Sequence, residues 1–393
     1  MKFDFETEVS RDGLGNMKQL MTPDFIREAG ISSFNAAEMD YPTCPGIRER
    51  VADLARNGLF GYTVRTAEYD DAVCWWMKNV RGWDASSDTL ITAQGTIFSV
   101  AAAVRMLTEP GEAIIVQPPV YYRYEQAAMR LGRRTVYNRL IERNGYYEMD
   151  FADLEEKMAE PENKLLVLCN PQNPVGRVWS EAELREIGRL SARYQVPVFC
   201  DEIFSEITFE GHRAVPYASL PEGQEWAITC TSPGKAFNLT GLNHANVFIP
   251  NPALREAFER QRTADHYGSM EPLAYAAILG AYNPDGAAWV QAVRDYIGEN
   301  VHILQQAAAE PGFPAYLYPV EGTYVGWLRW DGLPLEGEAL SGFLEREALF
   351  HMGPGSEYDP AGAGYTRISL GCQQHQLTAA LKRLKQAVRR RQA

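Results

Sequence analysis

The chain alternates short apolar runs with longer segments in which apolar residues recur at helical spacing. Apolar runs of about 4–8 residues that are bounded by turn residues are typical of buried strands. Six strands are predicted in this way: Asp88–Thr92, Ala113–Gln117, Leu165–Cys169, Val196–Cys200, Trp226–Cys230 and Asn246–Ile249. Because they alternate with helical segments, the pattern predicts an α/β protein with a mostly parallel sheet.

Five helices are predicted in the first half of the chain: Ile47–Asn57, Ala67–Val80, Gly95–Leu107, Tyr121–Leu131 and Ser180–Tyr194. Gly58 follows the first of them, at the place where a helix commonly ends. The last one opens with Ser180 and, three residues later, Glu183, which is the capping-box pattern.

From about Trp289 the pattern changes to one long helix, short strands around Tyr324–Trp330 and a final helix at Gln376–Arg391. This change predicts a large α/β domain over residues 46–288 and a smaller α+β domain over residues 289–393. Residues 1–45 are predicted to form an N-terminal arm and part of the small domain.

Composition narrows the function classes. The 393 residues carry 38 basic and 51 acidic side chains, a formal charge of −13, so nucleic acid is not expected as a partner. No run approaches the roughly 18 apolar residues of a membrane span, and acids occupy the N-terminus where a secretory signal would be apolar, so we expect no membrane contact and a cytoplasmic location. The six cysteines and six histidines show no zinc-site spacing, so no metal is predicted.

Four junctions after predicted strands carry residues suited to ligand binding, because ligands collect at the ends of strands in open α/β sheets. They contain Gly95 before a helix, Asn173 in a turn rich in proline, Asp201 after an apolar strand, and Lys235 among small residues. Each has an ordinary interpretation as well: a glycine that starts a helix, a capping turn, a solvated carboxylate or a solvated lysine. Together, and in this order along the chain, the four motifs favour a ligand-binding site over these ordinary interpretations.

These residues lie 78, 28 and 34 positions apart, and in that order the chain resembles the fold-type I pyridoxal-phosphate enzymes of the aminotransferase class I/II superfamily. It is most similar to their cystathionine β-lyase-like branch, the MalY/PatB-type C–S lyases. The resemblance runs from about Tyr41 to the C-terminal helix and rests on these stretches: Phe60–Thr63, Gln117–Tyr122, Tyr147–Phe151, Asn173–Trp179, Asp201–Ile203, Lys235–Gly241 and Gly364–Leu370.

The resemblance implies that residues 46–288 bind pyridoxal phosphate and assigns a role to each matching residue. Lys235 would carry the cofactor and then act as the base that removes the substrate's α-proton. Asp201 would pair with the ring nitrogen, Tyr121 would stack on the ring, and Asn173 would donate to the ring oxygen and contribute to substrate binding.

For the cofactor's phosphate and the substrate, the resemblance implies a second set of residues. Tyr62 would reach the phosphate of a neighbouring subunit, which implies a homodimer with shared active sites. Arg367 would hold the α-carboxylate of a small amino-acid substrate, although a surface arginine is the ordinary alternative. The remaining phosphate ligands would be Gly95, Thr96, Ile97 and Ser232.

The chain departs from this branch at positions near the substrate. Gln172 stands where relatives have histidine, and Phe204 stands where they have histidine or tyrosine, so Asn173 would be alone in binding the ring oxygen. Gly234 replaces a common serine, which removes one phosphate donor. The Phe34–Asp40 segment, which lines the substrate pocket in the branch, lacks the usual tryptophan.

The resemblance implies β-elimination from a cysteine S-conjugate to thiol, pyruvate and ammonia. Transamination begins with the same proton removal and stays open. So does a relative in specialised metabolism that processes a bulky S-conjugated cysteine by elimination or decarboxylative oxidation, because fold alone fixes chemistry weakly. A non-enzymatic sensor is disfavoured, because Lys235 and Asp201 are both present.

Overall fold

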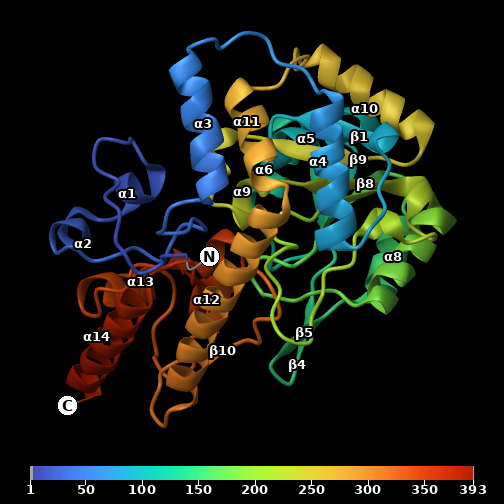
Figure 1. Ribbon diagram of the computed structural model, residues 1–393. Coiled ribbons are helices and arrows are strands. Elements are labelled where there is room, and N and C mark those ends of the chain that lie inside the picture. Colours follow the sequence, from blue (N-terminus) through green and yellow to red (C-terminus); the bar gives the residue numbers. More distant parts are fainter. Residues whose placement is uncertain (1–2, 393) are drawn as a thin grey trace.

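The computed structural model describes residues 3–392, and its centre is a seven-stranded sheet of order β1-β9-β8-β7-β6-β2-β3 (Figure 1). The pairs from β8 through β3 are parallel, whereas β9 is antiparallel to both β1 and β8. The strands are β1 Leu90–Ala93, β2 Ala113–Val116, β3 Arg134–Tyr137, β6 Asn163–Cys169, β7 Val198–Asp201, β8 Ala227–Thr231 and β9 Ala245–Phe248. All six predicted strands are present, and the predicted α/β class with a mostly parallel sheet is confirmed.

In the part of the chain before residue 289, three strands were not predicted. β3 is an edge strand that pairs only with β2, so it does not need the continuous apolar sequence by which buried strands are recognised. β4 (Ile141–Arg143) and β5 (Tyr146–Glu148) form a separate hairpin. Its turn residues Asn144 and Gly145 both have positive φ, which is the usual Asn-Gly hairpin signal and could have been read from the sequence.

Helices cover both faces of the large sheet. On one face, α5, α6 and α10 enclose a core that contains Val100, Tyr124 and Phe258. On the other face, α7 and α8 pack around Leu154 and Leu184. These helices are α5 Thr96–Leu107, α6 Arg123–Arg130, α7 Phe151–Ala159, α8 Glu181–Tyr194 and α10 Pro252–Ala264. The predicted capping box of α8 is confirmed.

Three helices pack beside this layer: α3 Pro45–Asn57, α4 Ala67–Trp76 and α11 Pro272–Ala281. α3 and α11 approach closely because both carry glycine at the contact. A Cβ on Gly280 would lie 2.6 Å from the Gly46 carbonyl oxygen, so only glycine allows this distance. α4 continues as a π-helical turn at Met77–Arg81, and α3 ends at Gly58 as predicted.

The C-terminal part has its own antiparallel sheet of order β10-β11-β13-β12. In Figure 1, α13 and α14 lie beside the N-terminal helices α1 and α2, away from the large sheet. The elements are α1 Met17–Met21, α2 Asp24–Glu28, α12 Pro284–Ala309, β10 Tyr316–Leu317, β11 Val325–Arg329, α13 Gly337–Arg346, β12 Gly353–Pro354, β13 Tyr365–Ser369 and α14 Gln374–Gln392. α12 begins before the predicted boundary at residue 289, and the three-part domain division stays a prediction.

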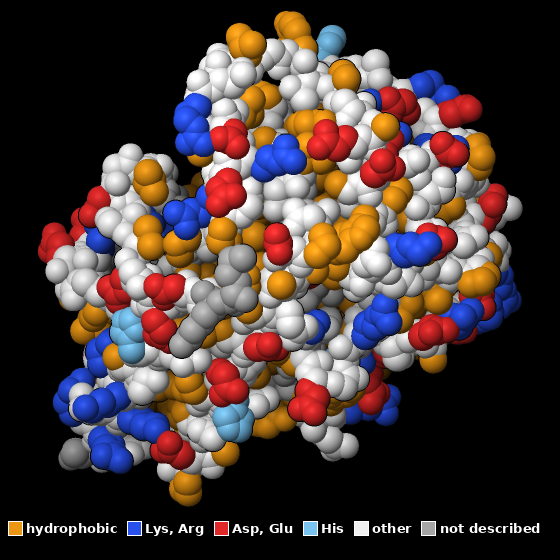
Figure 2. Space-filling model, in the orientation of Figure 1, with side chains coloured by type: hydrophobic (Ala, Val, Ile, Leu, Met, Phe, Trp, Pro, Cys, Tyr) orange, Lys and Arg blue, Asp and Glu red, His pale blue; other side chains and the backbone are white. Residues whose placement is uncertain are grey.

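Charges of both signs are spread over the face of the molecule that Figure 2 shows. Basic side chains gather near the C-terminal end of α14, whose last turn carries Arg389, Arg390 and Arg391. Between residues 3 and 392 there is no helix with both the length and the apolar character of a membrane span.

One buried histidine gives a testable pH dependence of stability. The imidazole of His244 has its Nε2 atom 2.7 Å from the Tyr69 hydroxyl, and burial lowers its pKa from 6.5 to about 4. Because the folded-state pKa is the lower one, the unfolded chain binds more protons as the pH falls from 6.5 towards 4. The stability contributed by neutral His244 is therefore complete above pH 6.5 and is lost below it.

When the pH falls from 7.5 to 5, we expect the free energy of unfolding of His244→Gln to decrease by about 2 kcal/mol less than that of the parent protein. Urea unfolding of both proteins at the two pH values measures this difference. Equal losses in the two proteins would show that His244 does not titrate in this way.

Candidate active site

The structure brings most of the predicted site residues together at the carboxyl ends of the central strands, and the site that these side chains form is called the cleft. Asp201 is the last residue of β7, Lys235 follows β8, and Asn173 follows β6. Arg367 reaches the same place from β13 of the smaller sheet, and its Nη1 lies 3.4 Å from the amide oxygen of Asn173. The carboxyl ends of neighbouring parallel strands meet at one edge of a sheet, which explains this convergence.

Lys235 lies in the short helix α9 (Pro233–Ala236), which Ser232 caps. Its Nζ donates to the Ala37 carbonyl oxygen at 2.8 Å and lies 5.5 Å from the centre of the Phe204 ring. Burial, together with the nearby Arg367 cation, lowers the pKa of the Lys235 amine to about 8. A larger neutral fraction makes this amine a better nucleophile and base near neutral pH than an ordinary lysine.

Asp201 is buried, with 2% of its surface exposed, so the interpretation as a solvated carboxylate is excluded. The Tyr124 hydroxyl donates to its Oδ2 at 2.5 Å, and the Ile203 backbone N–H donates to its Oδ1 at 3.2 Å. Burial raises the pKa of Asp201 to about 6, against the effect of these two hydrogen bonds. A buried carboxylate of this kind is well suited to bind a cationic ring nitrogen, which would hold it in its charged form.

Tyr124 was missed by the sequence analysis. It lies one helical turn after Tyr121, on the same side of the chain, and this spacing is the signal that could have identified it. Its ring centre is 5.7 Å from that of Tyr121. Tyr121 is therefore placed to line the cleft, whereas Tyr124 orients Asp201.

We expect Tyr124→Phe to lower kcat by about 10-fold, with a smaller change in KM, because a hydrogen bond to a charged group contributes roughly 1.5–3 kcal/mol. Steady-state kinetics of the holoenzyme measure this effect. Tyr137→Phe is the matched control, because the Tyr137 hydroxyl also donates to a carboxylate, that of Glu125, away from Asp201. Wild-type kcat in Tyr124→Phe would remove Tyr124 from the site.

The N-terminus of α5 has the properties of an anion site. Gly95 precedes it with φ +88°, a conformation that L side chains rarely adopt, and no side chain caps this helix end. The first helical residues are Thr96 and Ile97, whose backbone N–H groups point out of the helix end. A Cβ on Gly95 would lie 3.6 Å from the backbone of Asn243, so this helix end is close to the segment that follows Lys235.

Ser232 lies at the start of α9, near the same region, but its hydroxyl is already engaged. It donates to the His244 carbonyl oxygen at 2.6 Å and accepts from the Gly234 N–H at 3.1 Å. Its role as a phosphate donor stays a prediction.

Arg367 is buried, with 5% of its surface exposed, so the interpretation as a surface arginine is excluded. Its Nη2 donates to the Asn35 carbonyl oxygen at 2.7 Å, and its guanidinium lies 4.8 Å over the ring of Tyr358. Its Nε is buried without a hydrogen-bond partner among residues 3–392. A buried arginine with unused donor capacity is suited to bind a carboxylate.

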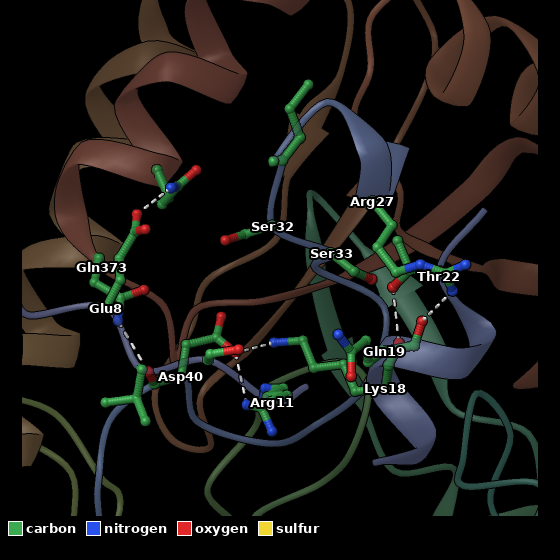
Figure 3. Close-up of a pocket in the computed structure, with 15 residues that line it drawn as sticks. Glu8, Arg11, Lys18, Gln19, Thr22, Arg27, Ser32, Ser33, Asp40 and Gln373 are labelled. Atoms are coloured by element: carbon green, nitrogen blue, oxygen red, sulfur yellow. Dashed lines mark hydrogen bonds and ion pairs between the residues drawn. The ribbon is translucent and has the colours of Figure 1, made fainter. Parts of the chain in front are cut away.

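The Phe34–Asp40 segment, where the sequence departs from the branch, is held by hydrogen bonds at Ala37 and at Asp40. Towards the cleft, the Ala37 carbonyl oxygen accepts from Tyr324 as well as from Lys235. Behind it, Lys18 and Arg11 donate to Asp40 at 2.6 and 2.8 Å, beside a polar cavity of about 250 Å³ (Figure 3). The segment is therefore held in place next to Lys235.

Gln172 and Phe204, the other two residues that differ from the branch near the substrate, also have structural roles. The Gln172 side-chain amide donates to the carbonyl oxygens of Gln117 and Pro119, which ties the turn after β6 to the turn that precedes Tyr121. Phe204 is buried against Tyr324, with ring centres 5.1 Å apart, and so provides an apolar surface next to Lys235.

Tyr62 is the one predicted site residue that the structure places away from the others. It is fully exposed, in the loop that joins α3 and α4 at the top of Figure 1. Leu59, Phe60 and Val64 in the same loop are also exposed, and Figure 2 shows apolar side chains at this edge. Tyr62 therefore takes no part in the cleft of its own chain.

Taken together, the cleft offers an uncapped helix N-terminus for a phosphate, a buried carboxylate for a ring nitrogen and a lysine amine for a carbonyl carbon. These groups fit pyridoxal phosphate. Gly95, Thr96 and Ile97 would hold its phosphate, Asp201 its ring nitrogen and Lys235 its reactive carbon.

Comparison with known proteins agrees with this geometry. Residues 30–384 match the family model described as aminotransferase class I and II, so the chain belongs to that family. It is 31% identical to cystathionine β-lyase PatB of Bacillus subtilis over 98% of this chain and 99% of PatB. It is 29% identical to protein MalY of Escherichia coli, over 98% of this chain and 99% of MalY.

Among solved structures, cystalysin from Treponema denticola, which contains a pyridoxal 5′-phosphate cofactor, superposes with a TM-score of 0.92. The sequences are 30% identical, and the match covers 99% of this chain and all of cystalysin. The predicted superfamily and its MalY/PatB branch are confirmed by these matches.

Proposed function

We propose that the chain is a pyridoxal-phosphate-dependent C–S lyase that cleaves cysteine S-conjugates by β-elimination to a thiol, pyruvate and ammonia. The observation that carries the proposal is the convergence of Lys235, Asp201 and Arg367 in one cleft. The chain also matches cystathionine β-lyase PatB and the C–S lyase from Staphylococcus hominis over nearly its whole length.

Each residue of the cleft has its own role in this reaction. Arg367 binds the α-carboxylate of the substrate, and Asn173, which already contacts Arg367, orients it. Lys235 Nζ takes the α-proton, while Asp201 keeps the positive charge at the ring nitrogen. Pyridoxal phosphate supplies the electron sink that makes this proton removable.

The sulfur then leaves from Cβ as a thiolate, and the remaining aminoacrylate hydrolyses to pyruvate and ammonia. Phe204 and Tyr121 give the cleft apolar surfaces next to the reacting atoms, which limit the access of water.

Product analysis of the holoenzyme tests this function. We expect cystathionine and a bulkier S-alkylcysteine to release thiol and pyruvate at the same rate with and without an added 2-oxo acid. Turnover that requires the 2-oxo acid would identify an aminotransferase. Carbon dioxide or an aldehyde would indicate decarboxylative oxidation, the chemistry of a specialised relative.

We further propose that the active form is a homodimer in which Tyr62 completes the partner's phosphate site. Its full exposure within an apolar loop supports this arrangement, since contiguous exposed apolar side chains mark interaction surfaces. Light scattering should give a mass of about twice the 44.1 kDa of one chain. A monomeric mass in an active preparation would contradict the shared site.

A further inference from the structure

The Ala37 carbonyl oxygen accepts hydrogen bonds from two side chains that come from different sheets. The Lys235 amine donates to it at 2.8 Å from the segment after β8, and the Tyr324 hydroxyl donates to it at 2.8 Å from the residue before β11. A carbonyl oxygen has two lone pairs, so it can accept from both donors at once. Tyr324 and Lys235 are therefore joined through a single atom.

The surroundings of the two donors are apolar. Tyr324 is fully buried, and its ring packs edge-on against that of Phe204, with centres 5.1 Å apart. The Lys235 Nζ atom lies 5.5 Å from the centre of the same Phe204 ring. Among residues 3–392, the Ala37 oxygen is the one hydrogen-bond acceptor of both donors. Its position therefore decides where the free Lys235 amine lies.

The backbone directly before Tyr324 is strained. Thr323 has φ +70°, a conformation that a β-branched residue rarely adopts. Its N–H donates to the Ile207 carbonyl oxygen at 2.8 Å, and the Val325 N–H donates to its hydroxyl at 3.1 Å, so this conformation is held from both sides. Strained backbone persists only where the surrounding structure enforces it, and it gathers at functional sites. The strain therefore points to Tyr324 as a residue whose position matters.

The Ala37 oxygen is also fixed by its own segment. Two residues later, the Met39 N–H donates to Asn238 Oδ1 at 3.1 Å, and the Asn238 amide donates back to the Met39 carbonyl oxygen at 3.0 Å. Asn238 comes three residues after Lys235 in the sequence. This pair of hydrogen bonds therefore holds the Ala37 segment at a constant place beside the lysine.

A base such as Lys235 needs a defined position for its amine. In the proposed reaction the amine is bonded to the cofactor at one stage and is free at the next, when it takes the α-proton. The flexible four-carbon stem of lysine lets an unpartnered amine occupy many positions, so the Ala37 oxygen limits this freedom. Because the Tyr324 hydroxyl shares that oxygen, it also weakens the charge-assisted hydrogen bond that would favour the ammonium form.

We propose that Tyr324 is a positioning residue, whose hydroxyl holds the Ala37 carbonyl oxygen as the resting point of the Lys235 amine whenever this amine is free of the cofactor. In the proton transfer that follows, the bond between Cα and its hydrogen breaks, the electron pair stays with the substrate, and the proton moves to Nζ. The inference rests on the proposed function, which makes Lys235 the base.

The first test measures the Lys235 amine in the apoenzyme. Tyr324→Phe removes the hydroxyl and keeps the ring. We expect this variant to raise the pKa of the Lys235 amine by about one unit above the parent value of about 8, because the ammonium form then has the Ala37 oxygen to itself. The pH dependence of acetylation by acetic anhydride, followed by mass spectrometry of the peptide that contains Lys235, gives this pKa.

The second test measures proton transfer in the holoenzyme. L-Alanine has an α-proton but no leaving group on Cβ, so the exchange of this proton in heavy water reports on the transfer without cleavage of a carbon–sulfur bond. Tyr324→Phe should slow the exchange about 10-fold and change the apparent affinity for L-alanine by less than about threefold. Proton nuclear magnetic resonance measures both quantities.

Tyr318→Phe is the matched control for both tests. Tyr318 is also a buried tyrosine of the small sheet region, but its hydroxyl accepts from Arg329 Nη1 at 2.9 Å, at the far end of β11 from Tyr324. The control should have the Lys235 pKa and the exchange rate of the parent.

The outcomes separate this inference from the proposed function. A raised Lys235 pKa and slower exchange in Tyr324→Phe, without any thiol release from cystathionine by the parent, would refute the lyase function and retain the role of Tyr324. A Lys235 pKa in Tyr324→Phe at or below that of the parent would overturn the role, as would exchange at the parent rate. Equal effects in Tyr318→Phe would also overturn it, since both tyrosines would then merely support the small sheet.

Discussion

Replacing Lys235 with alanine is expected to lower thiol release from cysteine S-conjugates by about 10³-fold or more, because the variant loses both the nucleophile that carries the cofactor and the base that takes the α-proton. The fold should stay intact, since the Lys235 amine makes one hydrogen bond, to the Ala37 carbonyl oxygen, and sits in no ion pair within the described chain. Thiol release and circular dichroism measure the two properties separately.

Lys157→Ala is the control for this variant, because Lys157 pairs with Asp153 on α7 and lies away from the cleft. After borohydride reduction, mass spectrometry should find the cofactor on the peptide that contains Lys235 in the parent and the control, and on no peptide of Lys235→Ala. A cofactor attached elsewhere, or activity close to that of the parent, would refute the assignment of Lys235.

The second large effect is expected for Arg367→Ala, which should raise KM for amino-acid substrates by about 10²-fold, because a bidentate charge-assisted contact to the α-carboxylate is lost. Cofactor affinity should change far less, since the phosphate and the ring nitrogen are assigned to Gly95, Thr96, Ile97 and Asp201. Steady-state kinetics and titration of the apoenzyme with pyridoxal phosphate measure the two quantities.

Arg185→Ala is a suitable control, because Arg185 lies on the surface of α8 and pairs with Glu181 and Glu222. If Arg367→Ala had the KM of the parent, the α-carboxylate would have to bind elsewhere. If cofactor affinity fell as much as substrate affinity, Arg367 would act through the cofactor site.

Much of the large sheet could be predicted because its central strands are buried on both faces and are therefore continuously apolar. β6 and β8 are recognisable from sequence for this reason. β3 was missed because an edge strand is free of that constraint. The β4–β5 hairpin was missed although its Asn-Gly turn is a strong local signal.

The site was predictable to the extent that it follows strand ends. Asp201 ends one buried strand and Lys235 closely follows another, so local sequence placed both at the edge of the sheet. The contact between Arg367 and Asn173 joins residues 194 positions apart, and no local pattern specifies it. That assignment came from the family resemblance alone.

Hydrogen bonds to site residues were the least predictable feature. Tyr124 was missed because only the packing of α6 on the sheet shows that its hydroxyl meets Asp201. The role of Gln172 in holding the turn before Tyr121 likewise depends on which carbonyl oxygens the fold brings near it. Sequence indicates that a polar residue is present, whereas the fold decides its partner.

The most direct test of the proposed lyase is the number of turnovers that each chain completes with a cysteine S-conjugate when no 2-oxo acid is present. The account predicts thiol, pyruvate and ammonia in equal amounts that continue to accumulate far beyond one equivalent per chain. A reaction that stops at one equivalent of an oxo acid per chain, with the carbon–sulfur bond intact, would contradict it and show that the chain transfers amino groups instead.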